Sequence, residues 1–234
     1  MKLVSVTRDR GSLTMTDYCL CMTPTHTHPS ADVDPSATIA AGCTIWHLAQ
    51  VREGAFLGAD SVVGRGAYLG PGVQVGKKVK IQNYALIYEP AEIGDYAFIG
   101  PAAVITNDRY PRSTDPSGHM KGVDDWDPAG VIVGTGASIG ARVVVLAGVS
   151  VGNWALVGAG AVVVRDVPAH GLVVGNPATQ VGWVGRSGNK LIAENELWRC
   201  PSSGELYGVT GTGLELHLRP SGSHRSSHEP KLRR

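Results

Sequence analysis

Side chains that could act as bases or hydrogen-bond partners recur along this sequence at spacings of eighteen residues or twice that. One such column contains His47 and Asn83, and a second contains Glu89 and Asn107. An imidazole titrates near neutral pH and can serve as a general base, and an amide or a carboxylate can orient a substrate amine. These columns are candidates for catalysis and substrate binding, although polar residues at a solvated corner of a repeat would look the same.

A second group of candidates lies between residues 107 and 130. Arg109 and Arg112 can each bind a phosphate through two parallel hydrogen bonds, or pair with the acidic residues near position 125. His119 lies in the same segment, where a surface histidine needs no function, yet loops on rigid scaffolds often carry chemistry. The sequence leaves both interpretations of these residues open.

A six-residue repeat determines where these candidates lie. Aliphatic residues recur at every sixth position over 33–105, and the pattern resumes over 133–163. The side chain four residues after each aliphatic is mostly small, and Pro71 and Pro101 both fall two residues after an aliphatic. Because proline cannot donate to a strand ladder, that phase of the repeat marks a corner.

The repeat predicts an all-β protein, a parallel β-solenoid of short strands with three hexads per triangular coil and about six coils. Coils stack at about 4.8 Å, so residues 18 apart lie directly above one another. The distance from Ile105 to Val133 is not a multiple of six, which predicts that one loop leaves the coil.

Four parts are expected along the chain. They are a lead-in over 1–30, the solenoid over 31–178 with its loop at 107–130, a C-terminal extension over 179–218, and a disordered basic tail over 219–234. Within the extension we expect a short helix near 190–198 and a hairpin near 208–213.

Composition excludes several classes of protein. The 234 residues include 31 Gly and 14 Pro, 18% are charged, and the formal net charge is +1. A net charge this small gives no general electrostatic attraction to nucleic acid or to an anionic membrane, so neither is expected as the principal partner. The N-terminal residues carry charges where a signal peptide needs an apolar run, so we expect a cytoplasmic protein. Four cysteines without two paired clusters suggest neither a disulfide framework nor a zinc site, and we expect no metal.

The segment 136–178, which begins GASIGARVVV and ends VVGNPA, closely resembles the closing coils of hexapeptide-repeat acyltransferases that use acetyl-CoA. The resemblance implies a left-handed parallel β-helix, whose hand departs from the usual crossover rule. In that family the pantetheine arm lies along outer coil backbones, and a basic residue meets a phosphate. It implies that acetyl-CoA is bound by Ala141, Gly158, Ala159, Arg165, Pro168, Asn176 and Pro177.

Earlier segments narrow the resemblance, which covers about residues 36–186. A narrower resemblance, to the nucleotide-sugar 3-N-acetyltransferases, is carried by the segments CTIWHLAQV, KIQNYALIYE and VITNDRYPRS. Enzymes of that family acetylate the 3-amino group of UDP-2-acetamido-3-amino-2,3-dideoxyglucuronate or of dTDP-3-amino-3,6-dideoxyhexoses. Many relatives carry a second Asn where this chain has Tyr84. We assign the following residues to the substrate: Gln82, Tyr84, Glu89, Thr106, Asn107, Arg109 and Arg112.

The tail CPSSGELY over 200–207 also looks like a tail found in some members of this family. If Cys-Pro-x-Cys were its parent pattern, Ser203 would replace the second cysteine. We therefore expect no zinc in the tail.

These assignments predict direct attack of the sugar amine on the thioester, with no covalent enzyme intermediate. Asn83 would orient the amine, and His47, about 9–10 Å below it, is the candidate base. The resemblance further implies a homotrimer with active sites between subunits.

Three other functions stay open. An O-acetyltransferase would use a histidine base such as His119, so that a His119 variant discriminates it. A zinc carbonic anhydrase would need three imidazoles, whereas the recognised coils hold only His47. A non-catalytic scaffold would not need an ending that binds coenzyme A.

Overall fold

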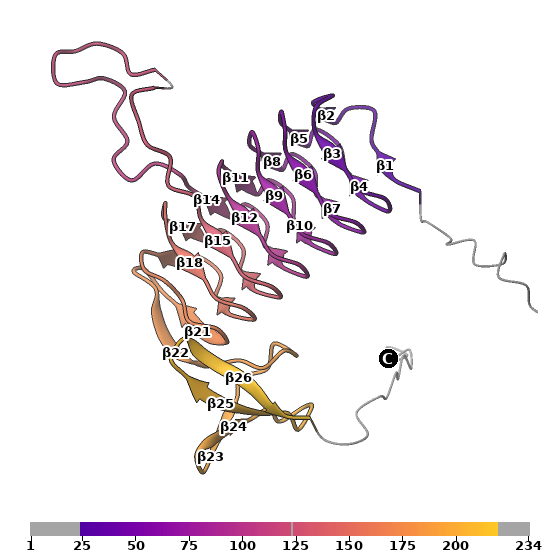
Figure 1. Ribbon diagram of the computed structural model, residues 1–234, viewed down its shortest axis with the longest axis vertical. Coiled ribbons are helices and arrows are strands. Elements are labelled where there is room, and N and C mark those ends of the chain that lie inside the picture. Colours follow the sequence, from indigo (N-terminus) through magenta and orange to yellow (C-terminus); the bar gives the residue numbers. More distant parts are fainter. Residues whose placement is uncertain (1–23, 123, 220–234) are drawn as a thin grey trace, which may run out of the picture.

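The computed structural model describes residues 24–122 and 124–219. Within these residues the chain forms a triangular prism of three parallel sheets, followed by a small antiparallel sheet (Figure 1). We name the walls of the prism sheets A, B and C, and the antiparallel sheet is sheet D. None of the described residues forms a helix that could span a membrane.

The strands of the three walls follow one another in turn along the chain. Sheet A contains β1 (His26–Thr27), β4 (Thr44–Ile45), β7 (Val62–Val63), β10 (Lys80–Ile81), β13 (Phe98–Ile99), β16 (Ser138–Ile139), β19 (Leu156–Val157), β21 (Gly171–Val174) and β22 (Thr179–Trp183). Sheet B contains β2 (Asp32–Val33), β5 (Gln50–Val51), β8 (Tyr68–Leu69), β11 (Leu86–Ile87), β14 (Val104–Ile105), β17 (Val144–Val145) and β20 (Val162–Val163). Sheet C contains β3 (Thr38–Ile39), β6 (Phe56–Leu57), β9 (Gln74–Val75), β12 (Glu92–Ile93), β15 (Ile132–Val133) and β18 (Ser150–Val151).

Each strand pairs with the strand one coil later. Thr44 pairs with Val62, and Val62 with Lys80, so the register is the predicted 18 residues. Across the loop Phe98 pairs with Ser138, after which the offset of 18 returns. Strands β1 to β18 form six coils, β19 and β20 with the bridge from Val151 to Val167 form a seventh, and β21 adds an eighth parallel strand to sheet A. The predicted parallel β-solenoid is confirmed, and it is longer than the predicted six coils.

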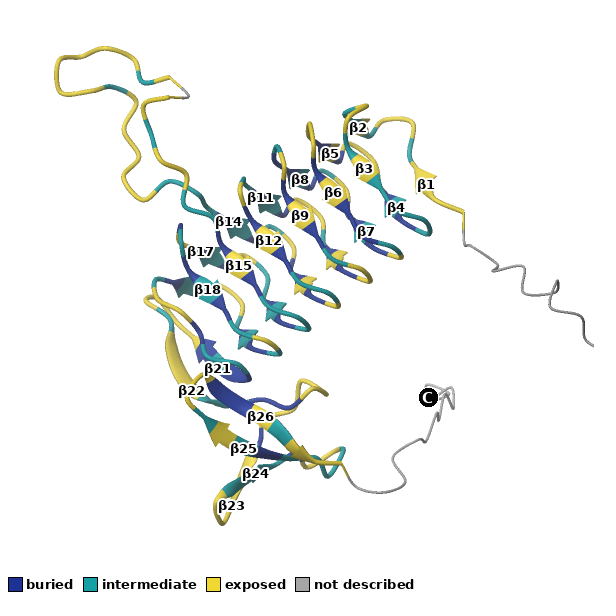
Figure 2. Ribbon diagram, in the orientation of Figure 1, coloured by how far each residue is buried: buried dark blue, intermediate teal, exposed yellow. Residues whose placement is uncertain are grey.

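The core of the solenoid is a stack of aliphatic side chains. The second residue of most strands points inward and is buried, and the first points outward, because side chains alternate along a strand (Figure 2). Small residues such as Ala49 and Ala55 are also buried and complete each layer. The corner residue after the turn takes a positive φ even where it is not glycine, as at Leu48 and Asp60.

The predicted loop leaves the prism between β14 and β15. It extends away from the coils in Figure 1 and contains one isolated bridge, Thr114 to Met120. Its base is closed by the N–H of Ala129, which donates to the carbonyl of Asn107 at 2.8 Å. The carbonyl of Ala129 accepts from the N–H of Gly148 at 3.0 Å, which ties the loop to the next coil.

The C-terminal extension differs from the prediction in one element. In place of the expected helix near 190–198, strands β23 (Ile192–Glu194) and β24 (Leu197–Arg199) pair antiparallel. The predicted hairpin is confirmed as β25 (Leu206–Thr210) and β26 (Gly213–Leu218). These four strands form sheet D, whose core is formed by Leu191, Cys200, Tyr207 and Leu214.

The solenoid begins earlier than the predicted boundary at residue 31. Thr27 of β1 pairs with Ile45, so a first coil starts at about His26. Thr27 is polar and occupies an aliphatic position of the hexad, which is why the sequence pattern did not include it. Residues 1–23 of the expected lead-in, and the expected tail beyond Arg219, lie outside the described residues.

Candidate functional site at the corners of sheet B

The predicted site residues divide between the two edges of sheet B. The A–B corners follow the strands of sheet A and carry His47, Gln82, Asn83 and Tyr84, whereas the B–C corners follow the strands of sheet B and carry Glu89. Between the corners the outer face of sheet B is apolar and half-buried from the third strand of the sheet onward, where it consists of Tyr68, Leu86, Val104, Val144 and Val162. The first two strands present the exposed side chains of Asp32 and Gln50. One chain therefore does not bring the two sets of candidates together.

Asn83 has a structural role in its A–B corner. Its Oδ1 accepts a hydrogen bond of 2.9 Å from the N–H of Arg65, one coil below. Asn153 makes the same bond to Thr135 in a C–A corner, the corner that follows a sheet C strand, so this bond belongs to the corner geometry. The amide nitrogen of Asn83 makes no hydrogen bond within the described residues and faces outward. Its catalytic role stays a prediction.

Tyr84 occupies the corner position with positive φ, at 60°. Its ring lies over Gly66, where a Cβ would come within 2.6 Å of the ring, and 52% of the residue is exposed. Asparagine is among the few residues that adopt this backbone conformation readily, which explains how relatives can place Asn here. Beside it, Gln82 is half-buried.

His47 is not close to Asn83. The imidazole stacks on His28 with 3.5 Å between ring centroids, and the nearly parallel ring of Trp46 has its centroid 6.1 Å away. Two coil steps separate it from Asn83, about 10 Å, so the two side chains cannot touch one reacting atom. The first coil also adds His26 and His28 to the histidines counted from the sequence. In the described part of the chain no three metal-ligating side chains converge.

Glu89 carries an unsatisfied carboxylate oxygen in its B–C corner. Its Oε2 lies against Gly70, is buried, and has no hydrogen-bond partner among the described residues. Burial and then the nearby Glu89 carboxylate raise the pKa of Tyr68, whose ring lies 5.3 Å from that of Tyr88. An unpaired buried carboxylate oxygen costs free energy, which a donor from a ligand or a neighbouring subunit would recover.

The base of the loop forms a pocket of about 570 Å³ at the next B–C corners, and its charged lining consists of two arginines and the carboxylates of Asp108 and Asp166. Arg109 and Arg165 both line it, although 56 positions of sequence separate them. The guanidinium of Arg109 lies directly against Gly148, so a Cβ at this position would displace the end of the arginine side chain. Gly148 has a φ of 77°, which favours glycine here.

A second pocket of about 530 Å³ lies on the other side of Arg109. Tyr110, Lys121 and Trp126 contribute to it, and the sequence analysis did not single them out. Aromatic and cationic residues within an ejected loop were the signal that could have identified them. Thr106 and Asn107 hold the loop base, Thr106 through a 3.0 Å bond from its hydroxyl to the carbonyl of Val145.

Two loop candidates lie outside both pockets. Arg112 is exposed, and its guanidinium donates to the carbonyl of Pro111. His119 lies in an exposed turn, where its Nδ1 is 2.9 Å from the hydroxyl of Ser117. Hydrogen bonds from Ser117 and from the backbone of His119 hold the pKa of Asp115 below its usual value.

The predicted acetyl-CoA residues occupy three places. Ala141, Gly158 and Ala159 belong to the A–B corners, and the turn containing Asn176 and Pro177 covers the end of sheet B beside them. The second place is the B–C corner, where Arg165 meets Arg109. The third is a larger cavity on the opposite side of the prism, which Pro168 lines.

Two models of repeat families match the solenoid. The model described as bacterial transferase hexapeptide (six repeats) matches residues 72–107. The model described as hexapeptide repeat of succinyl-transferase matches residues 53–84 and 130–165. The matched segments lie in the coils before and after the loop. Repeats of this kind build left-handed coils, so the predicted left-handed parallel β-helix is confirmed.

Similar proteins are also found among curated sequences and solved structures. Serine acetyltransferase 4 of Arabidopsis thaliana is 30% identical over 120 residues, which are 49% of this chain and 28% of that protein. The acetyltransferase domain of PglB from Neisseria gonorrhoeae is 24% identical, with a TM-score of 0.46. PerB from Caulobacter crescentus, in complex with CoA and GDP-perosamine, is 28% identical, with a TM-score of 0.37.

The matches are partial in both directions. The two structural alignments cover 68% and 69% of this chain and 58% of each solved chain. The chain thus spans under a third of the curated relative and over half of the two solved chains. Within 53–107 and 130–165 the repeats of this chain match the models of hexapeptide-repeat transferases.

Proposed function

We propose that the protein transfers the acetyl group of acetyl-CoA to the 3-amino group of a nucleotide-linked amino sugar. The observation that carries the proposal is the pocket at the loop base, where Arg109 and Arg165 converge. Acetyl-CoA and sugar nucleotides both contain a diphosphate, and guanidinium groups bind phosphates through paired hydrogen bonds.

The type of reaction rests on two further findings. The repeats match models of transferases, and the curated relative is a serine acetyltransferase. The segments around Gln82, Asn83 and Asn107 resemble the nucleotide-sugar 3-N-acetyltransferases, which supports an amine acceptor over a hydroxyl. Ala141 and Ala159 carry only methyl groups at the A–B corner, so an extended pantetheine arm could lie along the backbone there.

The chemistry requires positioning more than covalent catalysis. The neutral sugar amine attacks the thioester carbonyl, the carbon–nitrogen bond forms, and the carbon–sulfur bond breaks. Coenzyme A leaves as the thiol and takes up the proton that the amine loses. The free amide nitrogen of Asn83 would donate to a polar group of the bound sugar, and unpaired backbone N–H groups would stabilise the developing oxyanion.

We propose a cyclic homotrimer, in which the outer face of sheet B is covered by neighbouring subunits. This face is the most apolar wall of the prism, and a cyclic assembly would bury it. Such packing would also bring an A–B corner of one subunit near a B–C corner of the next. The candidate residues at these two corners, which lie apart within one chain, would then line one site. We place the enzyme in the cytoplasm, in keeping with the sequence analysis.

The test measures release of free coenzyme A thiol with acetyl-CoA and a panel of UDP- and dTDP-linked 3-amino and 4-amino sugars. Hydroxyl-only analogues complete the panel. We expect turnover with a 3-amino sugar nucleotide. Turnover confined to a hydroxyl analogue, and abolished by His119→Ala, would instead establish an O-acetyltransferase.

Variants then test the pocket itself. Arg165→Ala and Arg109→Ala should each lower kcat/KM about tenfold to a hundredfold, since each removes charged hydrogen bonds to phosphate. Lys77→Ala is the matched control, because Lys77 lies at a C–A corner, where it pairs with Asp95 at 3.5 Å and lies over the ring of Tyr96. Equal activity of all three variants would refute the assignment of the pocket.

A further inference from the structure

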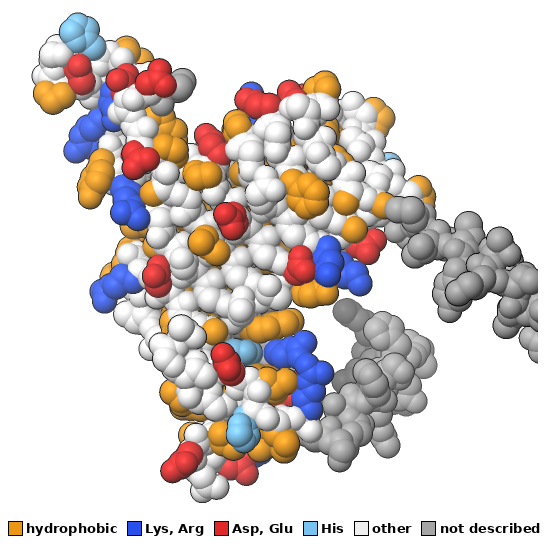
Figure 3. Space-filling model, in the orientation of Figure 1, with side chains coloured by type: hydrophobic (Ala, Val, Ile, Leu, Met, Phe, Trp, Pro, Cys, Tyr) orange, Lys and Arg blue, Asp and Glu red, His pale blue; other side chains and the backbone are white. Residues whose placement is uncertain are grey.

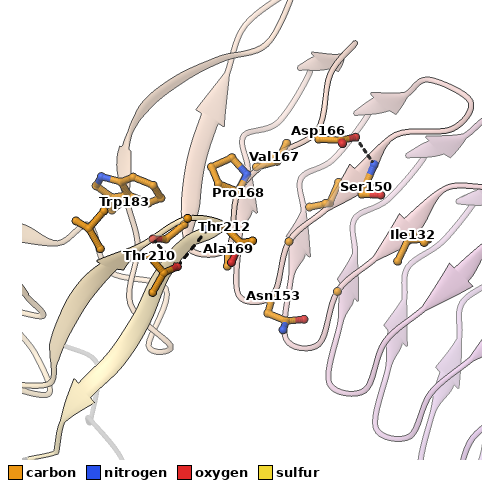
Figure 4. A pocket seen from close by; sticks show the side chains of 16 residues that line it. Ile132, Ser150, Asn153, Asp166, Val167, Pro168, Ala169, Trp183, Thr210 and Thr212 are labelled. Atoms are coloured by element: carbon orange, nitrogen blue, oxygen red, sulfur yellow. Dashed lines mark hydrogen bonds between the residues drawn. The ribbon is translucent and has the colours of Figure 1, made fainter.

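A further cavity shares only Asp166 with the pocket of Arg109 and Arg165. It has a volume of about 800 Å³ and lies between sheet C and the β25–β26 turn (Figure 4). Trp183 and Pro168 line one side, and Ile132 lies on the opposite side. The extension supplies Trp183 and the turn residues 209–213, so the cavity exists because sheet D packs on the solenoid.

The cavity continues as a groove along sheet C. An adjoining hollow of about 380 Å³ shares Ile132, Gly134 and Asn153 with it and reaches Phe56. The outer face of sheet C is only sparsely charged in Figure 3, with Glu92 the one charged residue at its outward strand positions. An elongated ligand could therefore lie across several coils.

The charges of the lining restrict the ligand. Among the described residues, neither Lys, Arg nor His lines the 800 Å³ cavity, and Asp166 contributes a carboxylate. Asp166 accepts from the N–H of Ser150 through Oδ1 at 2.8 Å, and its Oδ2 makes no hydrogen bond in the described part of the chain. This arrangement disfavours phosphates, nucleotides and coenzyme A, which need cationic partners.

The polar atoms of the lining are suited to hydroxyl groups. Asn153 uses Oδ1 to accept from Thr135, which leaves its NH₂ free to donate toward the cavity. The hydroxyls of Ser150 and Thr212 make no hydrogen bond with other described residues. The lining thus offers hydroxyl, amide and carboxylate groups on the solenoid side and the indole of Trp183 on the other side (Figure 4), and the C–H face of a sugar ring packs well on an indole.

We propose that this groove binds a neutral oligosaccharide. The apolar wall of Trp183 and Pro168 would contact a ring face, and Asp166, Asn153 and Thr212 would contact hydroxyls. The volume of the cavity lies in the range of about 300–1,000 Å³ that small-molecule sites occupy. The proposal does not rest on acetyl transfer: the groove runs along sheet C, and Asp166 is the one lining residue of the cavity that also lines the pocket of Arg109 and Arg165.

The test is isothermal titration calorimetry of the full chain with short neutral oligosaccharides of glucose, mannose, galactose and N-acetylglucosamine. We expect at least one of them to bind, and Ile132→Lys to weaken that binding about tenfold, which corresponds to about 1.4 kcal/mol. Ile132 points outward on its strand with 51% of its surface exposed, so the variant should fold. Asp166→Asn keeps the acceptor for Ser150 and should weaken binding less.

Phe98→Lys is the matched control, because Phe98 occupies the same outward position on sheet A with 37% exposure. It should bind the saccharide like the unaltered chain. The proposal is overturned if no oligosaccharide of the panel binds, or if Ile132→Lys leaves binding unchanged. Displacement of the saccharide by free coenzyme A would likewise overturn it, and coenzyme A release with amino sugars would still report separately on acetyl transfer.

Discussion

The solenoid and sheet D hold their cores together by different means. The solenoid repeats one contact, an aliphatic side chain above another such as Ile81 above Val63, through every coil. Sheet D has a small core of non-equivalent residues, and polar bonds complete it. Stability is therefore distributed evenly in the first region and concentrated in a few side chains in the second.

Tyr207 is the centre of the polar contacts in sheet D. Its buried hydroxyl donates to the Glu205 carboxylate at 2.7 Å and accepts from the N–H of Arg186 at 2.9 Å. The Sγ of Cys200 lies 3.2 Å from the hydroxyl of Ser187 and 3.3 Å from that of Ser202. Each bond is made once, so each can be removed individually.

The largest expected effect belongs to the solenoid core. Ile87→Ala should lower the free energy of unfolding by about 2–5 kcal/mol, because Ile87 is fully buried and the coils above and below cannot close the cavity. Denaturant unfolding followed by circular dichroism measures it. Gln74→Ala on an outward position should change the stability by under about 0.5 kcal/mol. Similar losses for both variants would contradict a core built from the inward column.

The second prediction concerns sheet D. Tyr207→Phe should cost about 1–3 kcal/mol, because the N–H of Arg186 loses its acceptor and the Glu205 carboxylate loses a donor. Hydrogen exchange should accelerate in residues 184–218 and stay unchanged in the coils. Tyr96→Phe, at a half-exposed corner, is the control and should have little effect. Faster exchange throughout the solenoid would show that the two regions unfold as one unit.

The third prediction compares two corners within the solenoid. Gly148→Ala and Gly54→Ala place a side chain at φ values of 77° and 66°, which should cost each variant about 1 kcal/mol. Only Gly148 contacts Arg109, since a Cβ at Gly54 meets nothing within 4 Å. The KM for acetyl-CoA or the sugar nucleotide should therefore rise only in Gly148→Ala. An equal rise of KM in both variants would show that the contact between Gly148 and Arg109 is not part of the proposed site.

The last prediction concerns a pH dependence in sheet D. Burial raises the pKa of Cys200, but hydrogen bonds from Ser187, Ser202 and Ser203 outweigh it and lower the pKa to about 6, from the ordinary 9.0. The folded state therefore binds fewer protons than the unfolded state between these values. The stability of sheet D should rise with pH from about 6 to 9, and this contribution is lost as the pH falls through 6.

Melting temperatures across this pH range test the assignment. Cys200→Ser should flatten the dependence, whereas Cys43→Ala should leave it unchanged, because burial raises the pKa of Cys43. A slope that persists in Cys200→Ser would assign it to another group. His170 is the neighbouring alternative, because burial lowers its pKa.

Most of the fold could be predicted from the hexads, because a period of six is the direct signature of a strand and a corner. The first coil was not predicted, because Thr27 is polar at the aliphatic position of its hexad. The strands of sheet D before its hairpin were not predicted, because the sequence there has no repeat, and the segment expected to be a helix forms β23 and β24.

The site could be predicted only in part. The 18-residue spacing predicted that Asn83 and Glu89 lie at corners. It could not show that the N–H of Arg65 donates to Oδ1 of Asn83, or that Oε2 of Glu89 has no hydrogen-bond partner among the described residues. The contact of Arg109 with Gly148 depends on the path of the loop, which no repeat encodes. The roles assigned to these residues stay predictions.

The loop enters at one corner and leaves the register of the coils intact, since Phe98 pairs with Ser138 as Lys80 pairs with Phe98. A corner of this solenoid can therefore receive foreign sequence without disturbing the layers on either side. Gly54 and Gly72 occupy equivalent B–C corners with open space around them. Peptides grafted there would be displayed in a row at intervals of about 4.8 Å, which makes the chain a scaffold for presenting several epitopes at fixed spacing.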